Sequence, residues 1–263
     1  MTKNDEALSP EDSGSISSQD PGCPSDGPIE TSHSAHVAAI VFAMVLPTLA
    51  TLLYFVVLSG SSWMKGVYFG SKVVQFAFPL AWVLLAQHRR IRFKAPDAKS
   101  VLTGLATGSG IVALGLLAYH GILKESDYLA NAPELISAKV ADMGLTSPIM
   151  YIVFAIFLAL PHSLMEEYYW RWFVFGQTRR VTSVGLAMGL SSFGFMAHHV
   201  IVIHQFLQNG WGATMFFSLC VAVGGLIWAW LYQKYQSLYG PWVSHLMVDL
   251  GIMYIGYDLL FRS

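Results

Sequence analysis

Seven long apolar segments dominate this chain and limit what it can fold into. Each is long enough to cross the roughly 30 Å hydrocarbon core of a bilayer as a helix that rises 1.5 Å per residue. Charged residues make up only 12% of the 263 residues, against roughly a quarter in soluble domains. We therefore expect an all-α, polytopic transmembrane helical bundle with about seven spans. The apolar segments are 35–58, 66–87, 100–120, 148–177, 182–206, 211–233 and 239–261.

The polarity of the sequence divides the chain into three parts. Residues 1–33 are rich in Ser, Pro, Gly and acidic side chains, and such a segment buries too little apolar surface to fold, so we expect a disordered tail. Residues 34–147 are expected to form three accessory transmembrane helices and an outer loop. A short interfacial helix is predicted in that loop at 133–143. Residues 148–263 contain nearly all the candidate functional residues and are expected to form the functional core.

The distribution of cations predicts how the bundle lies in its membrane. Lys and Arg gather in the connections after the second, fourth and sixth segments, and such connections are typically cytoplasmic. The N-terminus is then cytoplasmic and the C-terminus is outside, in what we expect to be the cell (plasma) membrane. The net charge of −1 gives no basis for nucleic-acid binding. The cations are Arg89, Arg90, Arg92, Lys94, Lys99, Arg179, Arg180 and Lys234.

Two adjacent carboxylates, Glu166 and Glu167, lie inside the fourth apolar segment. Ionisable groups are expensive at membrane depth, so a functional role is the default interpretation. Glu167 and Arg171 are four residues apart and can pair on one helical face. Glu166 points about 100° away and is free to face another helix. The alternative is that Glu166, Glu167 and Arg171 form a single ion cluster with a purely structural role. Lys72 in the second segment is expected to extend toward the outer surface.

The fifth and seventh segments supply histidines that the carboxylates could meet. Phe195 and His199 share a helical face at a four-residue spacing, while the adjacent His198 points elsewhere and offers a competing register. His245 and Asp249 repeat the spacing in the seventh segment, and Asp249 is the only further carboxylate that looks deep in a span. An aspartate in that position can orient the imidazole, or both side chains can ligate a metal.

Taken together, these residues resemble the motifs of the CPBP family, which includes the CAAX prenyl proteases and the bacteriocin-processing (Abi) intramembrane endopeptidases. Glu166-Glu167-x-x-x-Arg171, Phe195-x-x-x-His199 and His245-x-x-x-Asp249 occur in the family's order, with Ser191-Ser192 shortly before Phe195. The resemblance covers about residues 148–255. It implies a CAAX-protease-like peptidase that acts on a membrane-bound protein or peptide within the lipid bilayer.

The resemblance also implies a role for each motif residue. Glu166 and His199 would activate the attacking water, while His245 and Asp249 would stabilise the oxyanion or help to hold a metal. Glu167 and Arg171 would support the first motif. A divalent metal such as zinc, held by Glu166, His199 and His245, and a metal-independent glutamate mechanism both stay open. The sequence contains no His-Glu-x-x-His, so the usual zincin arrangement is absent.

One departure and one alternative function follow from the same residues. The last motif ends in Asp249 where the prenyl-protease branch has Asn, and an ionised Asp cannot donate a hydrogen bond to an oxyanion. The alternative is a membrane transporter or proton relay that uses the buried Glu, His and Asp groups. A haem protein with histidine ligands and a scaffold without turnover are further readings, which leave the acidic pair or the complete motif set without a role.

Overall fold

The computed structural model describes residues 31–145, 147–207 and 210–262. The regular structure of these residues is helical, and seven stretches are long and apolar enough to cross a membrane, which confirms the predicted fold class. The chain is accordingly a multi-pass membrane protein. Residues 1–30, most of the predicted tail, lie outside the described residues.

Each predicted span coincides with a helix or a run of helices to within a few residues. Each of the first four spans contains at least one π-helical segment, which is labelled η. The elements are α1 (His33–Leu52), η1 (Leu53–Val57), α2 (Met64–Ala81), η2 (Trp82–Ala86), α3 (Ala98–Ala118), η3 (Tyr119–Leu123), α4 (Ala132–Asp142), α5 (Pro148–Phe157), η4 (Leu158–His162), α6 (Ser163–Glu167), η5 (Tyr168–Phe175), α7 (Gly176–Thr178), α8 (Val184–Leu207), α9 (Trp211–Tyr235) and α10 (Tyr239–Phe261).

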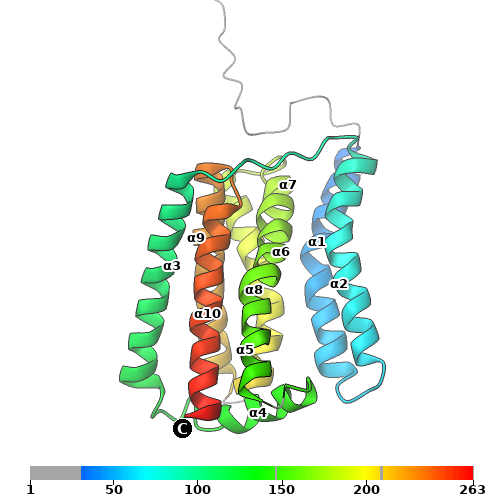
Figure 1. The fold of residues 1–263 in the computed structure, drawn as a ribbon. Coiled ribbons are helices and arrows are strands. Elements are labelled where there is room, and N and C mark those ends of the chain that lie inside the picture. The colour runs from blue at the N-terminus through cyan, green and yellow to red at the C-terminus, as the bar shows by residue number, and fades with distance from the viewer. Residues whose placement is uncertain (1–30, 146, 208–209, 263) are drawn as a thin grey trace, which may run out of the picture.

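The spans stand side by side, and the cation-rich connections gather at one end of the bundle (Figure 1). The connections 87–97 and 179–183 lie at this end, together with Lys234 in the last turn of α9, the connection 236–238 and the start of α1. We call it the basic end. The short helix α4 lies across the opposite end, beside the C-terminus, as expected for the predicted interfacial helix (Figure 1).

Small residues bring α3 close to α10. A Cβ atom at Gly104 would collide with the carbonyl oxygen of Gly240, and one at Gly108 would lie 3.0 Å from the Cα of Ser244. Only glycine lets the two helix backbones approach this closely. The close approach increases the van der Waals contact that holds helices together in a membrane. The α3 helix therefore supports the part of α10 that carries the histidine of the third motif.

Two π-helical segments interrupt the α-helical geometry of the fourth span. Pro161 lies in the π-helical turn η4, and proline removes a backbone donor and clashes with the carbonyl four residues earlier. The α-helical turn α6 follows and carries both glutamates, and the long π-helical segment η5 comes next. Such π turns occur frequently at functional sites.

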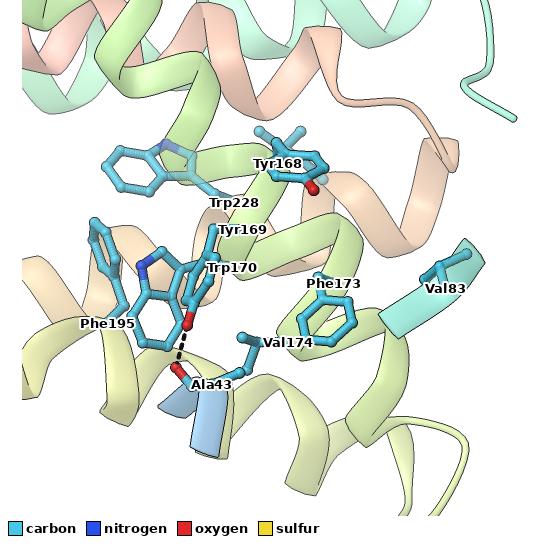
Figure 2. Packing of buried hydrophobic residues seen from close by; sticks show 10 residues of the cluster. Ala43, Val83, Tyr168, Tyr169, Trp170, Phe173, Val174, Phe195 and Trp228 are labelled. Atoms are coloured by element: carbon cyan, nitrogen blue, oxygen red, sulfur yellow. Dashed lines mark hydrogen bonds between the residues drawn. The ribbon is translucent and has the colours of Figure 1, made fainter. Parts of the chain in front are cut away.

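Aromatic residues of η5 fill the core between the accessory helices and α8. Trp170 and Phe173 are fully buried, and Trp170 packs edge-on against Phe195 of α8 (Figure 2). The Tyr169 hydroxyl donates a 2.6 Å hydrogen bond to the carbonyl of Ala43 in α1 (Figure 2). This packing fixes the rotation of the fourth span and thereby the directions in which the preceding glutamates point.

Candidate active site

Glu167 links the fourth span to α10 through two buried contacts. Its Oε1 accepts a 2.7 Å hydrogen bond from Nδ1 of His245, and its Oε2 lies 3.2 Å from Nε of Arg171. Glu167 and Arg171 are 0% and 1% exposed, so this is a fully buried ion pair, as the four-residue spacing predicts. Since the Nδ1 of His245 bonds to Glu167, its Nε2 is turned toward the other side of the site.

Arg171 is held by aromatic rings as well as by its carboxylate. Its guanidinium carbon lies 4.7 Å from the centre of the Phe195 ring and 5.1 Å from that of Trp228. Its Nη2 donates a 3.3 Å hydrogen bond to the carbonyl of Gly225. Cation–π contacts of this kind are strongest where water is excluded. Arg171 thus joins the fourth span to α8 and α9 behind the glutamates.

Glu166 points to a different set of partners, as its position on the helix predicts. Its Oε1 lies 3.4 Å from Nε2 of His162 and 3.7 Å from Nε2 of His198, and its Oε2 lies 3.7 Å from Nε2 of His245. All three separations exceed the 2.7–3.2 Å of an ordinary N–H···O hydrogen bond. Glu166 is therefore buried among imidazoles without being saturated by them, and it can engage a further ligand such as water.

Both histidines of α8 belong to the same group. The rings of His198 and His199 are 4.2 Å apart, and Glu166, His198 and His199 offer ligand atoms within 4.8 Å of one another. His198 is buried and stacks parallel to Trp170 at 5.7 Å. Nδ1 of His199 donates a 2.8 Å hydrogen bond to the carbonyl of Phe195. The spacing from Phe195 singles out His199, whereas the structure brings both neighbours to Glu166.

The third motif is positioned by its stacking partner. The Trp228 ring lies parallel to that of His245, with the ring centres 3.9 Å apart. The Trp228 indole donates a 3.1 Å hydrogen bond to Ser244, whose hydroxyl also accepts from Thr107 of α3 at 3.2 Å. Ser244 therefore connects the accessory helix α3 to the aromatic platform beneath His245.

Asp249 lies beside His245 on the side that faces Glu166. Its Oδ1 is 3.6 Å from Nε2 of His245, and its side chain is 20% exposed. The sequence suggests that Asp249 could orient the imidazole. In the structure the orienting contact on Nδ1 comes from Glu167, and Asp249 approaches the opposite nitrogen.

This geometry agrees with the comparison to known families. Residues 148–251 match the family described as type II CAAX prenyl endopeptidase Rce1-like. This segment is an Rce1-like domain. No curated relative and no solved structure matches the chain. The matched residues run from the start of α5 to two residues beyond Asp249, so the Rce1-like domain contains every residue of the three motifs.

One carboxylate and two imidazoles in the Rce1-like domain form a donor set that suits zinc. Glu166, His198 and His199 meet the distance requirement for a shared ion among the described residues. The sequence instead suggests Glu166, His199 and His245. His245 differs because its Nδ1 is occupied by Glu167 and its Nε2 lies between Glu166 and Asp249.

Two contributors to the site were not singled out by the motifs. His162 lies one turn before Glu166 and makes the shortest contact to that carboxylate. Its four-residue spacing from Glu166 was a usable signal. Trp228 carries no polar pattern in the sequence, so its stacking on His245 became visible only in three dimensions.

Proposed function

We propose that this protein is an intramembrane endopeptidase that hydrolyses a peptide bond of a membrane-associated protein or peptide. The observation that carries the proposal is the placement of Glu166, a buried carboxylate surrounded by histidines while its neighbour Glu167 takes the arginine. Membership of residues 148–251 in a peptidase family supports it. A purely structural ion cluster gives no reason for Glu166 to lack close partners.

In the proposed reaction, Glu166 accepts a proton from water as the resulting hydroxide attacks the scissile carbonyl. His199, oriented by its bond to the Phe195 carbonyl, positions the water with Glu166. The proton then passes to the leaving amine as the C–N bond breaks. His245 and Asp249 stabilise the oxyanion, and each does so only in its protonated form. Nδ1 of His245 already donates its proton to Glu167, so Nε2 carries a proton only in the imidazolium. An ionised Asp249 has no proton to donate.

Glu167 and Arg171 act as support in this mechanism. Glu167 fixes the ring of His245, and Arg171 neutralises Glu167 so that the buried charge is tolerated. A divalent metal held by Glu166, His198 and His199 would polarise the scissile carbonyl. The donor set is compatible with that addition, in which Glu166 and His199 would be ligands, whereas the roles given above are those of the metal-independent reaction.

The orientation in the membrane belongs to the same proposal. The Arg- and Lys-rich connections at the basic end favour a cytoplasmic location for that end and for the N-terminus. Glu166 is 12 residues from Thr178, which places it about 18 Å along the fourth span from its basic end. The peptide bond would then be cleaved inside the bilayer of the cell (plasma) membrane, on a substrate that is itself membrane-bound.

Replacement of Glu166 by Gln tests the proposal. We expect Glu166→Gln to reduce hydrolysis of a labelled peptide with a prenylated C-terminal CAAX sequence by about 10²–10⁴-fold, the range for loss of a general base. The purified protein should keep its melting temperature, because the amide fills the same space. Cleavage is measured by mass spectrometry of the products.

A matched control uses Glu134, an exposed carboxylate of α4 at the other end of the bundle. Glu134→Gln is expected to hydrolyse the peptide at the rate of the unaltered protein. Equal rates for the Glu166→Gln and unaltered proteins would end the proposal. Proton-coupled flux in liposomes that is lost in Glu166→Gln, with no peptide cleavage by either protein, would favour the transporter instead.

A further inference from the structure

Lys72 is a cation in the middle of the accessory helix α2. It lies 14 residues from Ala86, which is about 21 Å along the span from the basic end. His198 lies equally far from Val184, the basic end of α8. The ammonium of Lys72 and the imidazole of His198 therefore start from helix positions at the same depth of the bundle.

The side chain of Lys72 turns inward at this depth. Its Nζ donates a 3.2 Å hydrogen bond to Oε1 of Gln75, which is buried, and lies 5.7 Å from the centre of the Phe76 ring. Gln75 is one turn nearer the basic end. The expected extension of Lys72 toward the outer surface is therefore wrong, because a buried amide and an aromatic face hold the ammonium inside.

The neighbours of Lys72 connect it to the candidate active site. The hydroxyl of Tyr168, directly after the glutamate pair, donates a 3.2 Å hydrogen bond to the carbonyl of Phe76. The ring of Tyr169 packs edge-on against that of Phe76 at 6.2 Å. The Lys72 ammonium interacts electrostatically with both Glu166 and His198. The accessory helix thus places a positive charge beside Phe76, which packs against the two tyrosines that follow the glutamate pair.

Lys72 has no ion-pair partner within 4.0 Å in the described part of the chain. The Tyr68 ring lies 5.9 Å from the Lys72 ammonium, and Tyr54 packs edge-on against Tyr68 at 5.1 Å. An ammonium at membrane depth without a carboxylate partner indicates a functional site. At this depth phospholipid head groups are out of reach, because they lie outside the hydrocarbon core.

We propose that Lys72 binds the free C-terminal carboxylate of the substrate and thereby restricts hydrolysis to peptide bonds near a chain end. This inference rests on the proposed function, since it assigns the substrate of that site. A CAAX sequence is the C-terminal end of its protein, so three residues follow the cysteine and end in a carboxylate. An extended three-residue segment spans about 10 Å, a length suited to a cation placed beside the site.

A binding comparison tests this assignment without requiring turnover. The probe is a fluorescent peptide ending in S-farnesyl-Cys-Val-Ile-Met, prepared as the free acid and as the C-terminal amide. Both are titrated into full-length Glu166→Gln protein in nanodiscs, which prevents consumption of the peptide. We expect the acid to bind at least about tenfold more tightly than the amide, the size of one charge-assisted contact.

Three further variants in the Glu166→Gln background identify the residue. Lys72→Met is expected to bind the acid and the amide within about twofold of each other, since the charge has gone. Lys72→Arg keeps the charge and should keep most of the preference. Lys65→Met, a change to an exposed lysine two turns earlier on α2, should leave the preference unchanged. Equal binding of acid and amide by the parent, or a preference retained in Lys72→Met, would overturn the proposal.

Steady-state kinetics of the protein that retains Glu166 distinguish an effect on substrate binding from an effect on catalysis. Lys72→Met should raise KM for the acid and leave kcat unchanged. An equal fall in kcat for the acid and the amide would instead mean that Lys72 acts through Glu166, and would also overturn the proposal. A protein that shows the acid preference in binding but cleaves neither peptide would refute the proposed hydrolysis and leave the carboxylate site standing.

Discussion

Two ionic clusters share the helix α10, and they are built differently. The site cluster contains Glu166, Glu167, Arg171 and His245, and the Asp258 cluster lies about 20 Å farther along the helix. In the Asp258 cluster one carboxylate oxygen accepts a 2.8 Å hydrogen bond from the Tyr119 hydroxyl and a 2.7 Å contact from Lys124. Every charge there has a close partner.

The site cluster is closed on one side only. On the Glu167 side, Oε1 accepts a 2.7 Å hydrogen bond from His245, and Oε2 forms a buried ion pair with Nε of Arg171 at 3.2 Å, without a hydrogen bond between those two atoms. On the other side Glu166 keeps three contacts of 3.4–3.7 Å. A closed cluster stabilises a helix contact, whereas an open carboxylate keeps the capacity to take a proton or a ligand. We therefore assign chemistry to the open side alone.

The largest expected loss of activity that tests this comparison comes from replacing the two histidines on the Glu166 side, His198 and His199. His199 is less buried than His198 and has its Nδ1 anchored on a carbonyl, so we expect its Nε2 to face the substrate. We expect His199→Gln to lower kcat by about 10²–10⁴-fold. His198→Gln should cost about 10–100-fold, as for a residue that positions another. Single-turnover cleavage of the prenylated peptide measures both.

His204 provides the matched control on the same helix. Its ring stacks on Trp211 at 4.5 Å, away from the site cluster. His204→Gln should retain full activity. If His198→Gln proves the more severe variant, the roles of the two neighbours are exchanged and His198 is the residue that handles the water.

Replacement of residues on the closed side, Glu167 and Arg171, is expected to lower the stability of the protein and not specifically its catalytic rate. Arg171→Met removes one partner of a buried ion pair and leaves Glu167 unneutralised, which typically costs about 3–5 kcal/mol. A clearly lower melting temperature in detergent is expected. The double variant Glu167→Gln/Arg171→Met removes both charges and should recover part of that loss. A double variant less stable than Arg171→Met alone would show that the pair is not what Arg171 stabilises.

The sequence predicted the parts of this structure that depend on local spacing. The seven spans, the α4 helix, the Glu167–Arg171 pair and the separate direction of Glu166 all follow from helix length and periodicity. The roles of individual site residues stay predictions, although the structure brings Glu166, His199, His245 and Asp249 together around one cluster.

Contacts between different helices could not be predicted from local spacing in the sequence. The inward turn of Lys72 depends on Gln75 and the aromatic core, and the orientation of His245 depends on a glutamate of another span. The π-helical segments η4 and η5 alter the phase of the fourth span, which a constant 3.6-residue period cannot describe. Asp258 escaped notice because it lies near the end of its span, where charge is ordinary.

The smallest effect on catalysis is expected at the closed Asp258 cluster. Asp258→Asn keeps the shape of the side chain but removes the charge that Lys124 and the Tyr119 hydroxyl share. The melting temperature should fall, because the contact holds the end of η3 against α10. Cleavage by the folded protein should stay within about twofold, since distant sites act independently. A loss of cleavage in Asp258→Asn at a temperature where the protein is fully folded would show that α10 transmits changes from one cluster to the other. The contrast between a closed structural cluster and an open reactive one would then fail, because both clusters would set the position of His245.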